Sequence, residues 1–140
     1  MRKATQRRRI LVVDDDEMVR DAVAMMLSAD DHEVVTARNA AEALRFLEQG
    51  SYDAVISDLR IRSLDGPRLY RELKARQPEV LPRLVFMTGL ADDPAYARFL
   101  KETGVPVLAK PFTPEHLRQA VEQAFPTPWA REMIWVRICR

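Results

Sequence analysis

The sequence predicts an α/β domain in which a doubly wound, five-stranded parallel sheet is covered by five helices. Strand-like and helix-like segments alternate along the chain between its two ends. Several strand-like segments are almost wholly apolar, which is typical of a parallel sheet with helices on both faces. A length of 140 residues suits one domain with a buried core of its own.

The first half of the chain is predicted to form two strands and two helices. The apolar residues 10–13 predict the first strand, and from 19 to 27 apolar residues recur at helical spacing. Residues 33–36 predict a second strand. Asn39 is then a suitable N-cap, with a glutamate at the third helical position as in a capping box, and Gly50 ends this helix.

The second half continues the alternation with three strands and three helices. The strands are predicted at residues 54–57, 84–87 and 105–109. Pro67 opens the third helix at its first position, and Gly104 closes the fourth. Thr113, followed by proline and glutamate, is a typical start signal for the last helix.

The composition excludes several classes of protein. With 47% hydrophobic residues, 31% charged residues and a net charge of +1, the chain has no global field that favours nucleic acid or a membrane surface. No apolar stretch approaches the roughly 20 residues that span a bilayer, and the first apolar run is too short for a signal peptide. Cys139 is the single cysteine, which excludes an internal disulfide. We therefore expect a soluble, cytoplasmic protein with no nucleic-acid and no membrane partner.

The sequence divides into a lead-in, one domain and a tail. Residues 1–9 are a basic lead-in, expected to be solvated, and residues 10–125 form the domain. Two prolines end the last helix and leave a short apolar tail, 126–140. This tail could pack on its own domain, bind a partner or be vector-derived, and its pattern leaves the three open. No DNA-binding region is legible in the chain, so we expect its output to be a protein contact.

Polar residues stand at the ends of four predicted strands. Asp14 and Asp15 follow the first strand and Asp58 follows the third, whereas Thr88 and Lys110 follow the fourth and fifth. Ligands of open α/β sheets bind outside the carboxyl ends of the strands. The sequence therefore predicts that three carboxylates, a hydroxyl and an ammonium share one rim.

The charges on this rim predict a metal ion and a phosphoryl group. Two carboxylates ~4 Å apart repel by roughly 4 kcal/mol at an effective dielectric near 20. A divalent cation removes this repulsion, and a site of oxygen ligands favours Mg²⁺. Lys110 is suited to hold an anion as a point charge. A carboxylate placed beside both charges can act as a nucleophile towards phosphorus.

Each of these residues also has a plain structural explanation. Asp14, Asp15 or Asp16 could simply cap the next helix, Thr88 is a β-branched residue at a strand end, and Lys110 could be a solvated lysine. Their joint occurrence at successive strand ends favours a functional site over separate structural roles.

The motifs around these residues resemble the receiver domain of two-component response regulators. The resemblance covers residues 10–125 and rests on Val-Val-Asp-Asp-Asp at 12–16, Tyr-Asp-Ala-Val-Ile-Ser-Asp at 52–58, Asp-Gly at 65–66, Met-Thr-Gly at 87–89 and Lys-Pro-Phe-Thr at 110–113. It implies a flavodoxin-like fold. It also implies a phosphorylation-dependent switch, which is a binding module rather than a turnover enzyme.

The resemblance also assigns roles to the site residues. Asp58 is implied to accept a phosphoryl group from the phosphohistidine of a histidine kinase or phosphotransfer protein. Asp15 is implied to bind Mg²⁺ directly and Asp14 mostly through water, with Asp58 and the backbone carbonyl of Arg60 as further ligands. Lys110 is implied to contact the phosphoryl group, and its bond to the following proline is often cis in the family.

Thr88 is implied to be the switch hydroxyl. In the family it moves towards the phosphorylated aspartate, and the loop after the fourth strand follows. The surface of the fourth helix, fifth strand and fifth helix then changes for a downstream protein partner. Homodimerisation is compatible with this arrangement.

The chain departs from the family pattern at three places. Val107 stands where the family usually has an aromatic residue that rotates inward with the switch hydroxyl. Residues 61–64 replace the usual Met-Pro-Gly-Met turn. Arg60 and Leu90 occupy the two positions that tune the lifetime of the phosphoryl group in the family.

Two other functions remain open from the sequence. Asp14 and Asp16 mimic the Asp-x-Asp motif of haloacid-dehalogenase-like phosphatases, although Gly-Thr does not follow it here. A degenerate receiver that serves only as a docking module is the second alternative. His32 and His116 are expected to be surface residues, and neither is expected to donate a phosphoryl group.

Overall fold

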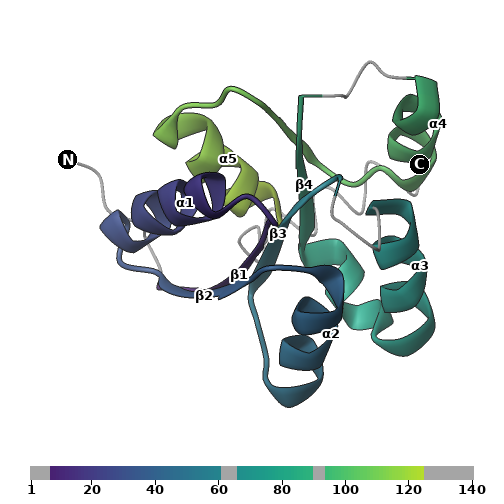
Figure 1. Ribbon diagram of the computed structural model, residues 1–140, viewed down its shortest axis with the longest axis horizontal. Coiled ribbons are helices and arrows are strands. Elements are labelled where there is room, and N and C mark those ends of the chain that lie inside the picture. Colours follow the sequence, from purple (N-terminus) through teal and green to yellow (C-terminus); the bar gives the residue numbers. More distant parts are fainter. Residues whose placement is uncertain (1–6, 61–65, 90–93, 125–140) are drawn as a thin grey trace, which may run out of the picture.

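The computed structural model describes residues 7–60, 66–89 and 94–124, and in these ranges it confirms the predicted α/β fold. Five parallel strands form one sheet in the order β2-β1-β3-β4-β5 (Figure 1). The elements are β1 Arg9–Val13, α1 Glu17–Ala29, β2 Glu33–Ala37, α2 Ala40–Gln49, β3 Ala54–Asp58, α3 Gly66–Arg76, the 3₁₀ helix η1 Pro78–Arg83, β4 Leu84–Thr88, α4 Pro94–Thr103, β5 Val107–Ala109 and α5 Pro114–Ala124.

The strands alternate their side chains between two apolar layers. Leu11 and Val13 point to the layer that α2, α3 and α4 cover, whereas Ile10 and Val12 point to the layer under α1 and α5. Figure 1 shows these two groups of helices on opposite faces of the sheet. Burial on both faces explains why these strands are continuous apolar runs.

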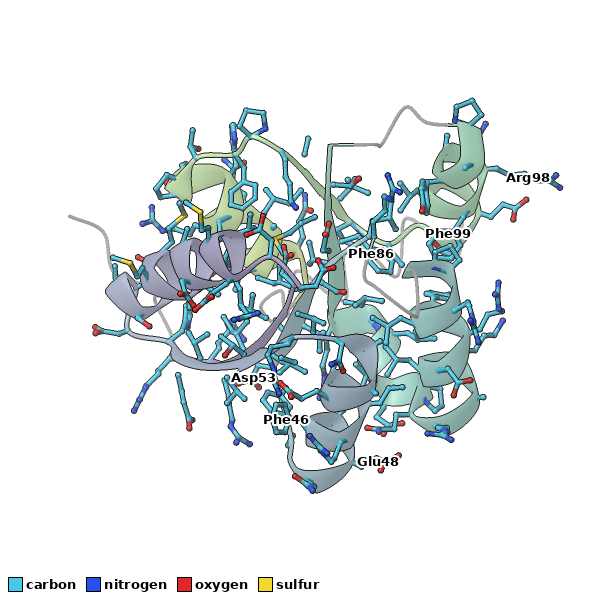
Figure 2. The ribbon with its side chains drawn as sticks, in the orientation of Figure 1. Phe46, Glu48, Asp53, Phe86, Arg98 and Phe99 are labelled. Atoms are coloured by element: carbon cyan, nitrogen blue, oxygen red, sulfur yellow. The ribbon has the colours of Figure 1, made fainter. Side chains whose placement is uncertain are left out.

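An aromatic cluster joins α3 and α4 to the sheet. The Phe86 ring on β4 lies 5.9 Å from the Phe99 ring on α4, and the two side chains face one another in Figure 2. Phe99 also makes an edge-on contact with Tyr70 of α3 at 5.6 Å between ring centroids. This cluster fixes α3 and α4 against the strand that ends in Thr88.

Capping side chains start the first two helices where the sequence predicts them. The Oδ1 atom of Asp16 accepts the backbone N–H of Met18 at 2.9 Å and begins α1. Asn39 Oδ1 accepts the N–H of Glu42 at 2.8 Å, while Glu42 Oε1 accepts the N–H of Arg38 at 3.1 Å. The N-cap and Glu42 thus each accept a backbone N–H at the start of α2, as in the predicted capping box, except that Glu42 bonds the residue before the N-cap.

Two local predictions differ from the structure in their boundaries. Strand β5 is shorter than the predicted 105–109, because Pro106 has no N–H with which to extend the ladder. The prolines after α3 do not simply end that helix, since Pro78–Arg83 forms a 3₁₀ helix. Short 3₁₀ turns tolerate proline near their start, and their pattern in a sequence is weak.

The structure contradicts the predicted exposure of two residues, His32 and Arg8. His32 is buried, with 8% of its surface exposed, and its Nδ1 accepts the backbone N–H of Arg8 at 3.1 Å. Arg8 is only 5% exposed, and Arg9 already belongs to β1. Arg8 and His32 directly precede β1 and β2. Because Arg9 pairs with Glu33, Arg8 and His32 lie against each other, and neither is exposed to solvent. His116 is exposed, as predicted.

Several sequence predictions lie outside the described residues. These are the remainder of the basic lead-in (1–6), the loop 61–64, Leu90 and the apolar tail 126–140.

Candidate functional site

The strand order brings the acidic residues together at one rim of the sheet. Strands β1 and β3 are neighbours, with Val13 paired to Ser57, so the residues that follow them lie side by side. One carboxylate oxygen each of Asp14, Asp15 and Asp58 lies within 4.8 Å of the others. The predicted convergence of three carboxylates is thus observed in the structure.

The other two predicted residues reach the same rim from β4 and β5. Asp58 pairs with Met87, which places Thr88 one residue beyond that pair, and Thr88 in turn pairs with Ala109. The backbone N–H of Lys110 donates to the carbonyl of Thr88 at 2.9 Å. The Lys110–Pro111 peptide bond is cis.

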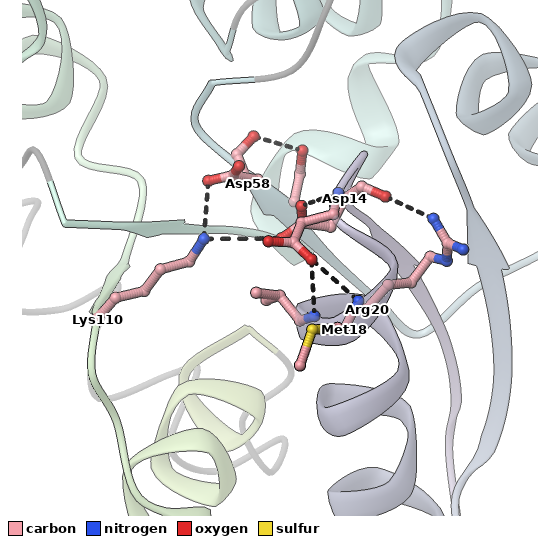
Figure 3. Close-up of polar contacts among 8 residues, drawn as sticks. Asp14, Met18, Arg20, Asp58 and Lys110 are labelled. Atoms are coloured by element: carbon pink, nitrogen blue, oxygen red, sulfur yellow. Dashed lines mark hydrogen bonds and ion pairs between the residues drawn. The ribbon is translucent and has the colours of Figure 1, made fainter.

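Lys110 lies between two of the carboxylates. Its Nζ is 3.3 Å from Asp58 Oδ1 and 3.7 Å from Asp14 Oδ2, as the dashed lines in Figure 3 show. One ammonium cannot neutralise three carboxylates, so the cluster keeps a net negative charge. Such a charge attracts a cation.

Asp14 is fully buried and only partly satisfied. Its Oδ1 accepts the N–H of Asp16 at 2.9 Å, but no described group donates a hydrogen bond to its Oδ2. Burial raises the pKa of Asp14, and the charges of Asp58 and Asp15 raise it further. A buried carboxylate oxygen without a donor, facing two further carboxylates, fits a divalent cation with oxygen ligands.

Asp58 is more accessible than Asp14. Burial raises its pKa, although Lys110 and a backbone hydrogen bond from Arg60 act in the opposite direction. Its side chain keeps 14% of its surface exposed, whereas that of Asp14 keeps none. Asp58 is therefore the carboxylate of this pair that a second molecule can approach.

Arg20 also reaches this site, and sequence reasoning missed it. Its Nη1 donates to the backbone carbonyl of Asp14 at 3.0 Å (Figure 3). The available signal was an arginine in the first turn of a helix that begins directly after the acidic residues. That signal is weak, because arginine is common on exposed helix faces.

Comparison with known proteins decides the family. The profile of the response regulator receiver domain matches residues 10–122. The chain belongs to this family. Receiver domains of this family act as signalling switches with histidine kinases and downstream effectors.

Three relatives illustrate the match. The chain is 32% identical over 115 residues to the transcriptional regulatory protein GlrR of Escherichia coli, covering 82% of this chain and 26% of the relative. It is 34% identical over 120 residues to the transcriptional regulatory protein FixJ of Bradyrhizobium diazoefficiens, covering 86% of this chain and 58% of the relative. The structure of the chemotaxis response regulator CheY4 of Vibrio cholerae matches with a TM-score of 0.75 at 25% identity, covering 86% of this chain and all of the other.

The chain thus spans only part of the length of GlrR and of FixJ. Within its described segments, no helix is both long and apolar enough to cross a membrane. Val107, the departure at the fifth strand, is 36% exposed on β5.

The phosphatase alternative is not favoured. Its second aspartate, Asp16, caps α1 and is not among the three residues whose carboxylates converge. The third converging carboxylate is instead that of Asp58, at the end of β3.

Proposed function

We propose that this receiver domain is a phosphorylation-dependent switch in which Asp58 is the phosphoacceptor. The observation that carries the proposal is the position of the Asp58 carboxylate. It is partly exposed, with the ammonium of Lys110 3.3 Å from its Oδ1 and an oxygen of Asp14 and of Asp15 within 4.8 Å. An oxygen of Asp58 attacks the phosphorus of a phosphohistidine, the P–N bond breaks, and the electron pair leaves with the imidazole nitrogen.

Asp14, Asp15, Asp58 and the backbone carbonyl of Arg60 are the proposed Mg²⁺ ligands. Mg²⁺ keeps several waters and accepts few protein ligands, which fits three carboxylates of which one is fully buried. When bound, the ion supplies positive charge that offsets the repulsion among the carboxylates and the charge on the phosphoryl oxygens. Lys110 adds a second positive charge 3.3 Å from Asp58 Oδ1.

Thr88 is the proposed switch hydroxyl. It is 2% exposed and ends the strand next to the one that carries Asp58. A phosphoryl group on Asp58 offers new acceptor oxygens to the Thr88 hydroxyl and the Lys110 ammonium. Moving a two-state equilibrium from 1:99 to 99:1 takes about 5.5 kcal/mol, which a few charge-assisted contacts can supply.

The partners follow from this chemistry. A histidine kinase or phosphotransfer protein donates the group, and the surface of α4, β5 and α5 presents the result to a downstream protein or a second copy. We place the receiver in the cytoplasm and assign it no nucleic-acid partner of its own. GlrR and FixJ are transcriptional regulators and CheY4 is a chemotaxis regulator, so the relatives represent two different outputs.

A docking module without phosphorylation is the second candidate. Val107 favours it, because a small, exposed valine gives β5 no large side chain to rotate inward. The two candidates differ in whether Asp58 accepts phosphorus at all.

Intact-mass measurement after treatment with acetyl phosphate and Mg²⁺ tests the choice. The wild-type chain should gain the mass of one phosphoryl group, and the Asp58→Asn variant should gain none. Asp21→Asn is the matched control, because Asp21 is exposed on α1 away from the three-carboxylate cluster. An unmodified wild-type chain at millimolar Mg²⁺ would support the docking module instead.

A further inference from the structure

An arginine of α1 holds the backbone between the two acidic residues that follow β1. The Nη1 atom of Arg20 donates to the carbonyl of Asp14 at 3.0 Å, and the side chain runs back past the start of its own helix (Figure 3). Helical side chains lean towards the N-terminus, so an arginine in the first turn can cover the residues that precede the cap.

The helix itself does not favour a cation at this position. The N-terminal end of a helix carries the positive end of its dipole, and a positive side chain there gains nothing from it. Arg20 follows the N-cap Asp16 by one turn, and its N–H donates to the Asp16 carbonyl at 2.9 Å. The bond to Asp14 therefore gives a reason for an arginine here that helix stability does not give.

Arg20 completes a set of contacts that fix Asp14 on every polar side but one. The N–H of Asp14 donates to the carbonyl of Ala37 on β2 at 3.1 Å, and its Oδ1 accepts the N–H of Asp16 at 2.9 Å. The carbonyl is held by Arg20. The Oδ2 atom, which lies 3.7 Å from Lys110 Nζ, is the one polar atom of Asp14 left without a hydrogen bond from a described group.

The same contact acts on Asp15. A peptide bond is planar, so holding the carbonyl of Asp14 also fixes the plane that contains the nitrogen of Asp15. Asp15 is exposed and lies two residues beyond the end of β1. Its carboxylate has an oxygen within 4.8 Å of oxygens of Asp14 and Asp58.

We propose that Arg20 is a positioning residue that orients the peptide between Asp14 and Asp15 so that both carboxylates face one cation. The proposal rests on the proposed Mg²⁺ site. Loss of a group that holds a metal ligand in place typically lowers metal affinity by 10- to 100-fold, and we expect the lower end of that range for Arg20.

The test is the dissociation constant of Mg²⁺ for the whole unphosphorylated chain, measured by isothermal titration calorimetry. Arg20→Met removes the donors and keeps an unbranched apolar stem, and it should weaken Mg²⁺ binding by about 10-fold. Arg20→Gln is polar but, like methionine, two atoms shorter than arginine, so its amide does not reach the carbonyl and it should weaken binding equally. Arg20→Lys keeps a charged donor on a side chain only one atom shorter and should restore part of the affinity.

Arg118→Met is the matched control. Arg118 holds the other end of α1, where its Nε and Nη2 lie 3.0 and 3.1 Å from the carboxylate of Asp30. Its loss should lower the melting temperature and leave the Mg²⁺ dissociation constant within two-fold of wild type. A structural role of Arg20 would make the two arginine variants behave alike.

The possible results separate the two proposals. If Arg20→Gln binds Mg²⁺ within two-fold of wild type, or if Arg118→Met weakens binding as much, the role of Arg20 is overturned and the Mg²⁺ site stands. If the wild-type chain itself binds no Mg²⁺ at millimolar concentration, the metal site of the proposed function fails, and the role of Arg20 fails with it. Should Arg20→Met not fold, the glutamine and lysine variants decide the question.

Discussion

The ammonium of Lys110 lies 3.3 Å from Asp58 Oδ1, although the two residues are 52 positions apart in the sequence. Lys110 also has Asp14 Oδ2 within 3.7 Å, so one cation serves two carboxylates from different strands. This arrangement exists because β5 and β3 both neighbour β4, and the chain leaves each of them at the same rim.

Replacing Lys110 with methionine should slow phosphorylation of Asp58. A charge-assisted hydrogen bond contributes about 1.5–3 kcal/mol, so the rate with acetyl phosphate should fall roughly 10- to 100-fold. The rate is measured by intact mass against time at saturating Mg²⁺. Lys74→Met on the exposed side of α3 is the control and should keep the wild-type rate. An equal rate in both variants would show that Lys110 does not act on the phosphoryl group.

Neutralising Asp58 should stabilise the protein when Mg²⁺ is absent. Burial and the Asp15 charge raise the pKa of Asp58 in the folded state above that in the unfolded chain. The ionised group therefore destabilises the fold at neutral pH, and this penalty disappears as the pH falls below the unfolded pKa near 3.8. We expect Asp58→Asn to raise the free energy of unfolding at pH 7.5 by about 1 kcal/mol, the lower end of the repulsion between two nearby carboxylates.

The measurement for Asp58→Asn is urea unfolding in chelator and again in excess Mg²⁺. Wild type should gain stability from Mg²⁺, and the variant should gain less. The advantage of the variant in chelator should shrink as the pH is lowered from 7.5 towards 4. A variant less stable than wild type in chelator would mean that the Lys110 contact outweighs the repulsion.

The rim residues could be predicted from the sequence because parallel strands align their carboxyl ends. Asp14, Asp58, Thr88 and Lys110 each follow an apolar run, so strand order was the single further fact needed. The flavodoxin-like order β2-β1-β3-β4-β5 supplies it. These residues therefore lie at the rim that the pattern predicted.

Contacts between segments that carry no periodic pattern could not be predicted. His32 lies in a polar turn, and nothing in its neighbours indicates that the strand pairing of Arg9 with Glu33 would bury it. Arg20 is similar, because its partner is a backbone carbonyl that no sequence pattern marks. In both cases the partner is a main-chain group, which is invisible in side-chain spacing.

Stability should fall at mildly acidic pH because of His32. Burial lowers the pKa of His32 below the usual 6.5, so the folded state keeps the ring neutral while the unfolded chain binds a proton. Asp30, Asp31 and Glu122 oppose this shift, but burial is the largest effect. The neutral ring makes its full contribution to the free energy of unfolding above pH 6.5, and this contribution is lost as the pH falls below that value. Protonation also removes the Nδ1 acceptor of the Arg8 N–H.

Urea unfolding at pH 7.5 and 5.5 checks this expectation. His32→Gln should be less stable than wild type at pH 7.5 by about 1 kcal/mol, the value of one buried hydrogen bond. The difference in the free energy of unfolding between His32→Gln and wild type should narrow at pH 5.5. Only wild type has a ring that takes up a proton on unfolding, and this proton uptake favours the unfolded chain. His116→Gln, on an exposed residue, is the control and should leave the pH dependence unchanged.

Gly66 should not tolerate a side chain, for reasons of space. It begins α3, and its N–H donates to the carbonyl of Leu59 at 2.8 Å, directly after Asp58. A Cβ at this position would lie 2.5 Å from Leu59 Cδ1, 3.0 Å from the Leu59 carbonyl oxygen and 3.2 Å from Phe86. Gly66→Ala should therefore lower the free energy of unfolding by about 1–3 kcal/mol, as overpacking does.

Gly89→Ala is the matched control for Gly66→Ala. A Cβ at Gly89 would have no atom within 4 Å, and its stability should change by less than about 0.5 kcal/mol. Because Leu59 adjoins Asp58, the Gly66 variant should also phosphorylate more slowly than Gly89→Ala at equal Mg²⁺. Equal stability of the two alanine variants would mean that α3 can move away from Leu59 without destabilising the fold. The close contact between Gly66 and Leu59 would then not be needed to hold Asp58 in place.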